Sequence, residues 1–159
     1  MILIFDTETT GLRPGRVIQL SYVMATKTDV KGKNFFFYTP FVEPSAIAVH
    51  GFTPEKLAVL SGGKTFSEFL EEIDDDFRAA DLTVAHNFPF DFSFMSAEFG
   101  YESRIFHYKE KFDTMRELKN DVAIPSPAKF GKYTDPKLVE LAAFYDIYDY
   151  DVTRKSIEL

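Results

Sequence analysis

The order of apolar and polar residues predicts that the chain begins with strands of a sheet. An apolar run covers residues 1–7, and two β-branched or aromatic runs follow at residues 17–26 and 33–41. Apolar residues on both faces are typical of a central strand, which is covered from both sides. We therefore expect three strands, the first of them central, with a hairpin-like connection between the second and the third.

Three short patterns predict where helices begin. Thr53-Pro54 places a capping hydroxyl before a proline at the first helical position, and Asp135-Pro136 repeats the arrangement with a carboxylate. Residues 65–68 form a capping box, Thr-Phe-Ser-Glu. Behind this box the apolar residues recur at helical spacing and give one apolar face: Phe66, Phe69, Leu70, Ile73 and Phe77.

The second half of the chain alternates between the two kinds of element. We expect a strand at residues 82–86, a helix from about Pro89, a strand at residues 104–108 and a helix at residues 136–145. This order predicts an α/β fold, a mixed sheet with helices packed against it. Residues 119–135 contain prolines and lysines without clear periodicity, and we interpret them as an ordered loop or a lid.

Composition and charge narrow the function classes. A length of 159 residues fits one domain, and the absence of cysteine excludes disulfides and thiolate metal sites, so we expect a cytoplasmic protein. No apolar run approaches the length of a membrane span, and we expect no membrane partner. A net charge of −7 argues against a protein that coats duplex DNA. It does not exclude an enzyme that holds one strand end through bound cations.

Two carboxylates stand at the end of the first predicted strand. Asp6 and Glu8 are two residues apart, so their side chains point to the same face, and no basic residue lies within four positions of either. Such a pair repels itself unless a cation lies between the carboxylates, and hard oxygen ligands favour Mg²⁺ or Mn²⁺. The alternative is that the strand ends here and water solvates both groups. For this pair alone, the alternative is the stronger interpretation.

A third carboxylate follows the strand predicted at residues 82–86. In the segment AHNFPFD, Asp91 falls in the first turn of the next helix, where exposed amides and the helix dipole stabilise an anion. We therefore expect Asp91 to stay ionised and available to a metal. The alternative is an ordinary first-turn acidic residue, which is the better interpretation when the segment is taken alone.

Several segments in one order resemble a known family. The matching segments are FDTETTG at residues 5–11, VHGFT at 49–53, AHNFPFD at 85–91 and FDT at 112–114. In this order and spacing they resemble the DnaQ-like, or DEDD, family of 3′–5′ exonucleases over roughly residues 1–147. Several linked motifs are far more specific than one.

This resemblance implies a fold, an activity and a set of site residues. The fold would be ribonuclease H-like, a five-stranded mixed sheet flanked by helices, with its second strand antiparallel. The activity would be two-metal hydrolysis of single-stranded DNA or RNA from its 3′ end to nucleoside monophosphates, with two Mg²⁺ or Mn²⁺ ions. The residues that match catalytic, metal-binding positions are Asp6, Glu8 and Asp91. Those that match positions near the 3′-terminal nucleotide are Thr9, Gly11, His50 and Asn87.

The chain departs from the family at its last motif. The family has there a fourth carboxylate and a general base, which is a His five positions before the Asp in one branch and a Tyr in the other. His107 is the last histidine, and no Asp stands five positions after it. Tyr145 and Asp149 have the Tyr-branch spacing, but Tyr145 continues an apolar helical stripe and is better explained by core packing. We favour the His branch and expect one exonuclease domain that lacks its C-terminal helix; loss of the motif is the alternative.

Several alternatives stay open at this stage. A nucleic-acid-binding module that kept the fold without hydrolysis competes with the enzyme, and a proofreading subunit of a DNA polymerase competes with a free-standing exonuclease. Elsewhere we expect Asp113 to cap a helix, residues 35–37 to be strand core, residues 74–76 to form a solvated helix face, and His107 to serve packing.

Overall fold

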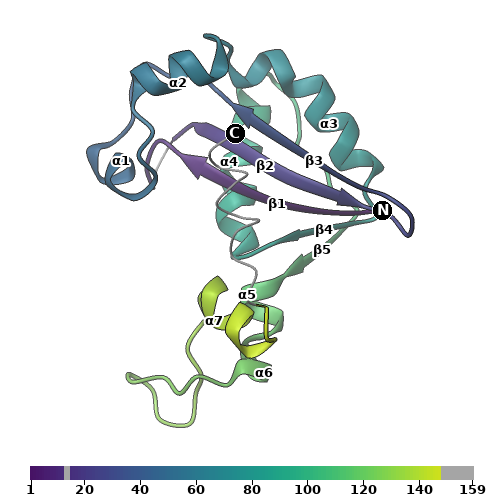
Figure 1. The fold of residues 1–159 in the computed structure, drawn as a ribbon, viewed down its shortest axis with the longest axis vertical. Coiled ribbons are helices and arrows are strands. Elements are labelled where there is room, and N and C mark those ends of the chain that lie inside the picture. The colour runs from purple at the N-terminus through teal and green to yellow at the C-terminus, as the bar shows by residue number, and fades with distance from the viewer. Residues whose placement is uncertain (13–14, 148–159) are drawn as a thin grey trace. The chain divides into compact units, whose positions relative to one another are not determined.

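The computed structural model describes residues 1–12 and 15–147, and it contains a five-stranded mixed sheet (Figure 1). The strands are β1 (Ile2–Thr9), β2 (Val17–Ala25), β3 (Val30–Phe36), β4 (Leu82–Ala85) and β5 (Glu110–Asp113). The helices are α1 (Pro44–His50), α2 (Pro54–Ser61), the 3₁₀ helix η1 (Phe66–Phe69), α3 (Leu70–Ala79), α4 (Phe88–Tyr101), α5 (Thr114–Glu117), α6 (Lys119–Val122) and α7 (Leu138–Phe144). The chain divides into two compact units, Met1–Phe112 and Asp113–Leu159.

The sheet has the strand order β3-β2-β1-β4-β5. Strand β1 pairs antiparallel with β2 and parallel with β4, and β2 pairs antiparallel with β3. The prediction of a mixed sheet with a central first strand and an antiparallel second strand is confirmed. No helix in the described part of the chain is long and apolar enough to cross a membrane.

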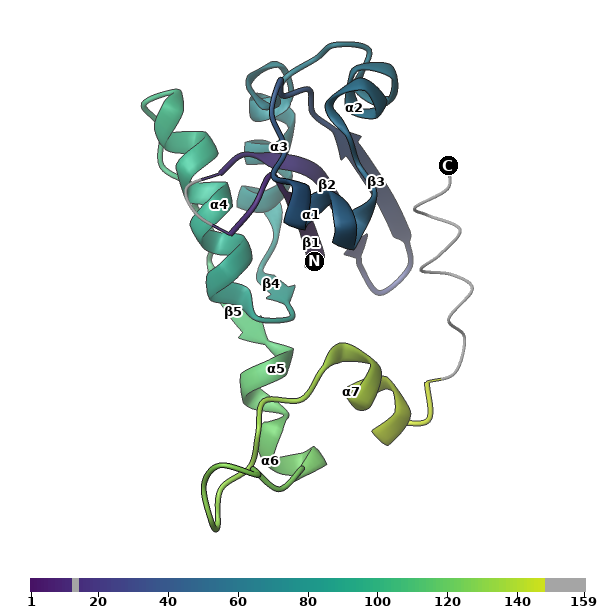
Figure 2. The ribbon, with the colours of Figure 1, turned by 90° about the vertical axis from the view of Figure 1, so that its left-hand side faces the viewer.

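Within the described part of the chain, strand β1 is covered on one face only. Leu3 and Phe5 are almost completely buried, whereas Ile2 and Ile4 on the opposite face are 42% and 48% exposed. The expected burial of both faces is therefore wrong for the described residues. The reason is that the helices that supply the main apolar cluster, α3 and α4, cover the face of Leu3 and Phe5 (Figure 2).

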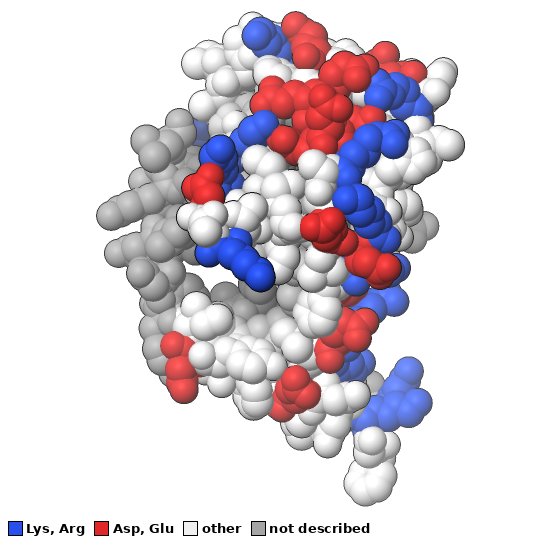
Figure 3. All heavy atoms as spheres, turned by 90° about the vertical axis from the view of Figure 1, so that its right-hand side faces the viewer, with Lys and Arg blue, Asp and Glu red and all other residues white. Residues whose placement is uncertain are grey.

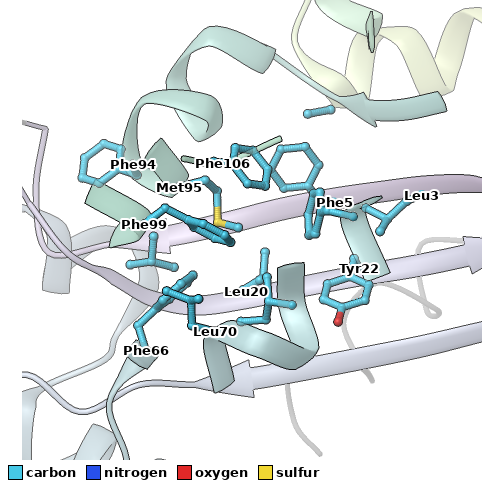
Figure 4. Packing of buried hydrophobic residues seen from close by; sticks show 14 of the residues in the cluster. Leu3, Phe5, Leu20, Tyr22, Phe66, Leu70, Phe94, Met95, Phe99 and Phe106 are labelled. Atoms are coloured by element: carbon cyan, nitrogen blue, oxygen red, sulfur yellow. The ribbon is translucent and has the colours of Figure 1, made fainter. Parts of the chain in front are cut away.

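Phenylalanine rings dominate the core between the sheet and these two helices (Figure 4). Phe5 of β1 meets Phe77 of α3 edge-on at 5.2 Å and Phe88 of α4 edge-on at 5.8 Å. Such aromatic pairs add about 0.5–1.5 kcal/mol each to the effect of burial. Because Phe88 begins α4, this packing also fixes the start of α4 beside β1.

Local helix signals are confirmed where no long-range contact competes with them. Thr53 caps α2 by accepting a hydrogen bond from the Lys56 amide at 3.3 Å. In the capping box, the Glu68 carboxylate accepts from the Thr65 amide at 2.8 Å, although the first turn is 3₁₀ rather than α-helical.

Other boundaries differ from the predictions. Residues 104–108 are not a strand; the strand β5 begins at Glu110, and β3 covers residues 30–36 rather than 33–41. The last predicted helix begins at Leu138 instead of Pro136. Asp135, the predicted cap, does not cap this helix, because its carboxylate accepts a hydrogen bond from the Lys119 ammonium at 2.7 Å.

Candidate active site

The paired carboxylates of β1 lie on the same face of the strand, as predicted, and this face is opposite the core. Burial alternates along the strand, so that Thr7 and Thr9 are buried while Asp6 is exposed and Glu8 is partly exposed. Protein atoms around Glu8 reduce its hydration and raise its pKa to about 7, and the negative charge of Asp6 adds to this effect.

The pKa of Asp6 is also raised, although water reaches its side chain. Reduced hydration is the largest cause, while a hydrogen bond with the Thr7 backbone and the nearby His86 lower the pKa and partly offset it. The carboxylates of Asp6 and Glu8 are therefore electrostatically coupled, and both are more easily protonated than ordinary surface acids.

Asp91 lies in the first turn of α4 and is 3% exposed. Its Oδ1 accepts two hydrogen bonds from Thr7, one from the amide at 3.1 Å and one from the hydroxyl at 2.6 Å. Burial nevertheless raises the pKa of Asp91 to about 7, and the charge of Asp6 raises it further against the effect of the Thr7 hydrogen bonds. Desolvation therefore has a larger effect on this pKa than the local amides and the helix dipole, which favour the ionised form.

The three carboxylates form one electrostatic group centred on Asp6, whose charge raises the pKa of both Glu8 and Asp91. A divalent cation would offset this repulsion, so the residue types and their coupling fit such an ion. The side chains do not form a ready-made cage, since no group of three His, Cys, Asp or Glu residues among residues 1–12 and 15–147 converges in a way that could hold a metal ion.

His50 connects the end of α1 to the end of β1. The backbone amide of Phe52 donates to His50 Nδ1 at 3.1 Å, and His50 Nε2 lies 3.1 Å from the Thr9 carbonyl. Because an amide can only donate and a carbonyl can only accept, Nδ1 is the unprotonated nitrogen and Nε2 carries the hydrogen. Burial lowers the pKa of His50 and favours this neutral form. His50 therefore acts here as a structural link between the two segments.

The turn after β1 is tightly packed. The Thr9 hydroxyl donates to the Gly11 carbonyl at 2.9 Å, and the Glu43 amide donates to the Thr10 carbonyl at 2.8 Å. A Cβ atom at Gly11 would overlap the Glu43 carboxylate, so the end of the Glu43 side chain would have to move to admit a larger residue. No sequence pattern predicted a role for Glu43, since its approach to Gly11 depends on tertiary structure.

Asn87 forms the junction between β4 and α4. Its backbone is left-handed, with φ 67° and ψ 52°, a conformation that asparagine adopts more readily than most residues. The Asn87 carbonyl accepts from the Phe90 amide at 2.9 Å and closes the first turn, which carries Asp91. The backbone of Asn87 thus helps to position the Asp91 carboxylate, and this role does not depend on the contacts of the Asn87 side chain.

An ion pair that the sequence patterns did not predict joins the buried Glu98 of α4 to Arg16, just before β2. Glu98 is 1% exposed and accepts from Arg16 Nε at 2.9 Å, from Arg16 Nη2 at 2.9 Å and from the Val17 amide at 2.8 Å. The Arg16 guanidinium also lies 4.7 Å from the centre of the Tyr101 ring. The available signal was the spacing of seven residues between Asp91 and Glu98, which places two carboxylates on one face of an otherwise apolar helix.

Two predictions about aromatic and imidazole groups outside the site are wrong. Tyr145 is 43% exposed and its hydroxyl donates to Asp121 at 3.1 Å, so it is not a core residue; its proposed companion Asp149 lies outside the described residues. His107 is exposed and lines an open cavity of about 300 Å³ instead of packing in the core.

Predictions about the remaining acids and the phenylalanine run had mixed outcomes. Asp74 is 2% exposed and pairs with Arg78 at 2.9 Å and Arg104 at 2.5 Å, so a solvated face is wrong for this residue. Asp113 caps α5 as predicted and accepts from the Met115 amide at 3.1 Å. Residues 35–37 pack against the two apolar clusters, also as predicted.

Comparisons with known proteins find similar sequences and structures. A family model described as exonuclease, RNase_T, matches residues 3–147. The chain is 32% identical over 112 residues to the DNA polymerase III subunit epsilon of Salmonella typhimurium, covering 64% of this chain and 44% of that protein. It is 36% identical over 107 residues to the subunit from Pasteurella multocida, covering 61% and 41%. The chain thus spans less than half the length of these relatives.

Solved structures share the fold. A product-bound exonuclease I superposes with a TM-score of 0.75 at 18% identity, covering 96% of this chain and 40% of that chain. Exonuclease I of E. coli in complex with a dT13 oligonucleotide gives a TM-score of 0.72 at 18% identity, covering 92% and 36%. The five-stranded mixed sheet and its flanking helices are therefore a ribonuclease H-like fold.

Proposed function

We propose a function on one premise: the chain belongs to the exonuclease family whose model matches residues 3–147. From this premise and the carboxylate group, we infer that the protein hydrolyses phosphodiester bonds at the 3′ end of a single nucleic-acid strand and releases nucleoside monophosphates. The observation that carries the proposal is the electrostatic coupling of Asp6 to Glu8 and Asp91 at the end of a central strand. Such a group is unfavourable by itself and is relieved by cations.

In this proposal each carboxylate has a defined part. Asp6, Glu8 and Asp91 would hold two Mg²⁺ or Mn²⁺ ions, whose chemistry is to activate water and to stabilise the leaving 3′ oxygen. Because the pKa of Glu8 and that of Asp91 are both about 7, protons compete with cations for these side chains near neutral pH. Thr7 orients Asp91 through its amide and hydroxyl.

The end of β1 and the segment after α1 would receive the terminal nucleotide. Thr9 and Gly11 form a closed turn, and His50 fixes the position of Thr9 through its carbonyl. Asn87 sets the start of the helix that carries Asp91. These contacts keep the backbone of the binding segment in place before a strand arrives, which reduces the entropy lost on binding.

None of the described residues is assigned as the general base or as the fourth carboxylate of the site. We propose that a His and an Asp five positions later, in a longer chain, supply them. Loss of a general base costs on the order of 100- to 10,000-fold in rate, so we expect the 159-residue chain to be close to inactive. Strong activity of this chain that Asp149→Ala abolishes and Tyr145→Phe reduces would favour the Tyr branch instead.

The solved structures and the sequence relatives support a proposal for the substrate, the cellular location and the partner. Two of the similar solved structures are complexes of E. coli exonuclease I with the DNA oligonucleotides dT13 and dA16. We therefore propose that the substrate is single-stranded DNA, with RNA as the competing substrate, and that the protein acts in the cytoplasm. Because the curated relatives are DNA polymerase III subunits, a polymerase is the partner that we propose to test by copurification.

Metal binding can be tested without relying on catalysis. Isothermal titration with Mn²⁺ should show binding by the parent chain and none by Asp6→Asn, with Asp75→Asn as a matched control because Asp75 is an exposed acid on α3. Unchanged binding in Asp6→Asn would reject the assignment of the metal ligands.

Direction of digestion tests the activity itself. With Mn²⁺ and the full-length protein, a 5′-labelled single strand should shorten stepwise from its 3′ end, and a 3′-phosphate should block the reaction. Internal cuts that appear first would identify an endonuclease. Strand binding without hydrolysis in the full-length protein would favour the non-catalytic nucleic-acid-binding module.

A further inference from the structure

Residues 124–134, between α6 and α7, form a hydrogen-bonded hairpin (Figure 1). The Thr134 amide donates to the Ile124 carbonyl at 2.9 Å, and the Ser126 amide donates to the Lys132 carbonyl at 2.8 Å. At the tip, the Lys132 amide donates to the Lys129 carbonyl at 3.2 Å. Gly131 has a φ of 70°, which permits this tight turn. The tip is therefore held by its own backbone and presents its side chains outward.

The side chains at this tip combine aromatic rings with positive charges. Phe130 is fully exposed, at 107% of its reference area, and Tyr133 is 42% exposed. Lys129 and Lys132 flank Phe130 and are also exposed. A single exposed aromatic residue needs no explanation, but a fully exposed ring between two lysines on an ordered turn presents two kinds of contact at once.

The local charge contrasts with that of the whole chain. The net charge is −7, and acidic side chains gather in a patch on the face shown in Figure 3. Residues 122–134 contain two lysines and no acidic residue. The acidic surface repels a polyanion such as nucleic acid, whereas the two lysines of this hairpin attract it.

We propose that this hairpin is a contact site for a single nucleic-acid strand, with Phe130 stacking on a base and Lys129 and Lys132 contacting phosphates. An aromatic ring can stack on any base, because every base has a flat face. Bases and phosphates alternate along a nucleic-acid strand, so lysines beside the ring can contact the phosphates next to the stacked base. A protein partner fits less well, because a stable protein interface needs roughly 1,000 Å² of buried area, far more than one hairpin tip offers.

This inference rests on the proposed function, since it assumes that a strand is the substrate, and it adds a site in the second compact unit. The carboxylates and the terminal-nucleotide segments lie in the first unit. The hairpin residues are therefore distinct from those that match positions near the terminal nucleotide, and they would add contacts to the nucleic-acid strand.

Binding to a fluorescein-labelled dT12 strand, followed by anisotropy in EDTA, tests the hairpin without any hydrolysis. Phe130→Ala should weaken binding by about 5- to 150-fold, the range for loss of one base-stacking ring, while Phe130→Trp should retain it. Phe144→Ala is the matched control, because Phe144 is an exposed ring of the same unit outside the hairpin, 49% exposed. Equal affinity of the parent and Phe130→Ala would overturn the proposal, and so would failure of the parent to bind dT12 at low salt.

The lysines give a second, independent readout. Lys129→Gln with Lys132→Gln should make the slope of log affinity against log salt concentration shallower by about 1.4, since each phosphate contact to a single strand contributes about 0.7. Lys27→Gln with Lys31→Gln, in the turn after β2 and near the start of β3, should leave the slope unchanged. Failure of the proposed function is distinguishable, because it would appear as absent metal-dependent shortening by the full-length protein while strand binding and its dependence on Phe130 persist.

Discussion

The two compact units differ in what holds them together. In Met1–Phe112, a continuous cluster of buried aromatic and aliphatic side chains joins the sheet to α3 and α4. Among the described residues of the second unit, 113–147, the buried ones are Asp113, Pro136 and Leu141. Short helices, caps and the hairpin's own hydrogen bonds account for the order that the second unit has.

The difference matches the chemistry that each unit carries. Carboxylates that share a site must be held in place against their repulsion, and a strand and a helix in a packed core provide that rigidity. A contact with a flexible nucleic-acid strand does not need side chains that are held so rigidly. Protein segments with few buried contacts, such as the second unit, unfold locally at low free-energy cost. We therefore expect mutations in the first unit to have larger effects on stability than comparable mutations in the second.

Removal of a core ring should give the largest effect on this comparison. Phe77 is 0% exposed and meets Phe5, Tyr22 and Phe106. Phe77→Ala should lower the free energy of unfolding by about 3–5 kcal/mol in urea denaturation. Phe144→Ala in the second unit should change it by less than about 0.5 kcal/mol. Similar losses in the two variants would contradict the proposed difference between the units.

The ion pair between Arg16 and the buried Glu98 should rank next. Glu98→Gln would weaken the acceptor for Arg16 and the Val17 amide, at a cost of roughly 1–3 kcal/mol in the free energy of unfolding. Arg16 is partly exposed and can regain water, which limits the loss. Urea denaturation measures the change, with Glu102→Gln as an exposed control in the turn after α4. No loss of stability would show that the connection after β1 is held by other contacts.

Protonation of the site should give a smaller, pH-dependent effect. The folded-state pKa of Asp91 is raised to about 7, above its ordinary value of 3.8. Such a group contributes stability that is present below pH 4 and is lost as the pH rises through 7. Without metal, Asp91→Asn should therefore stabilise the chain at pH 8 by roughly 1–2 kcal/mol, less than the shift alone implies because Asp91 is coupled to Asp6.

The same variant offers a control at lower pH. At pH 4.5, where the parent carboxyl is protonated in the folded state, Asp91→Asn should change the melting temperature much less than at pH 8. Adding Mg²⁺ at pH 8 should stabilise the parent more than the variant. A variant that is less stable than the parent at both pH values would mean that the Thr7 hydrogen bonds require a carboxylate.

The smallest effect should come from the surface ion pair of the second unit. Lys119 contacts Asp135 at 2.7 Å, and both side chains are substantially exposed. Lys119→Ala should cost about 0.2–1 kcal/mol in the free energy of unfolding, and 0.5 M NaCl should remove most of that difference. A loss as large as that of Glu98→Gln would mean that this pair holds the second unit together.

Local sequence rules determined much of the fold and the identity of the carboxylates. The alternation of β1 placed Asp6 and Glu8 on one face, and the caps at Thr53 and Thr65 depend on residues no more than three positions away. Such patterns are readable because the interacting groups are close in the chain. The order of the family segments added the third carboxylate, Asp91.

Tertiary structure alone decided how these groups behave. Desolvation by the surrounding chain raised the pKa of Asp91, against the local effect of the helix start. Asp135 does not cap a helix because Lys119 engages it, and Asp74 is buried because Arg104 reaches it from 30 residues away. Glu98 likewise finds Arg16 across 82 residues of sequence. Burial and long-range ion pairing depend on which segments meet in space, and the free energy of a charged group is set by that surrounding.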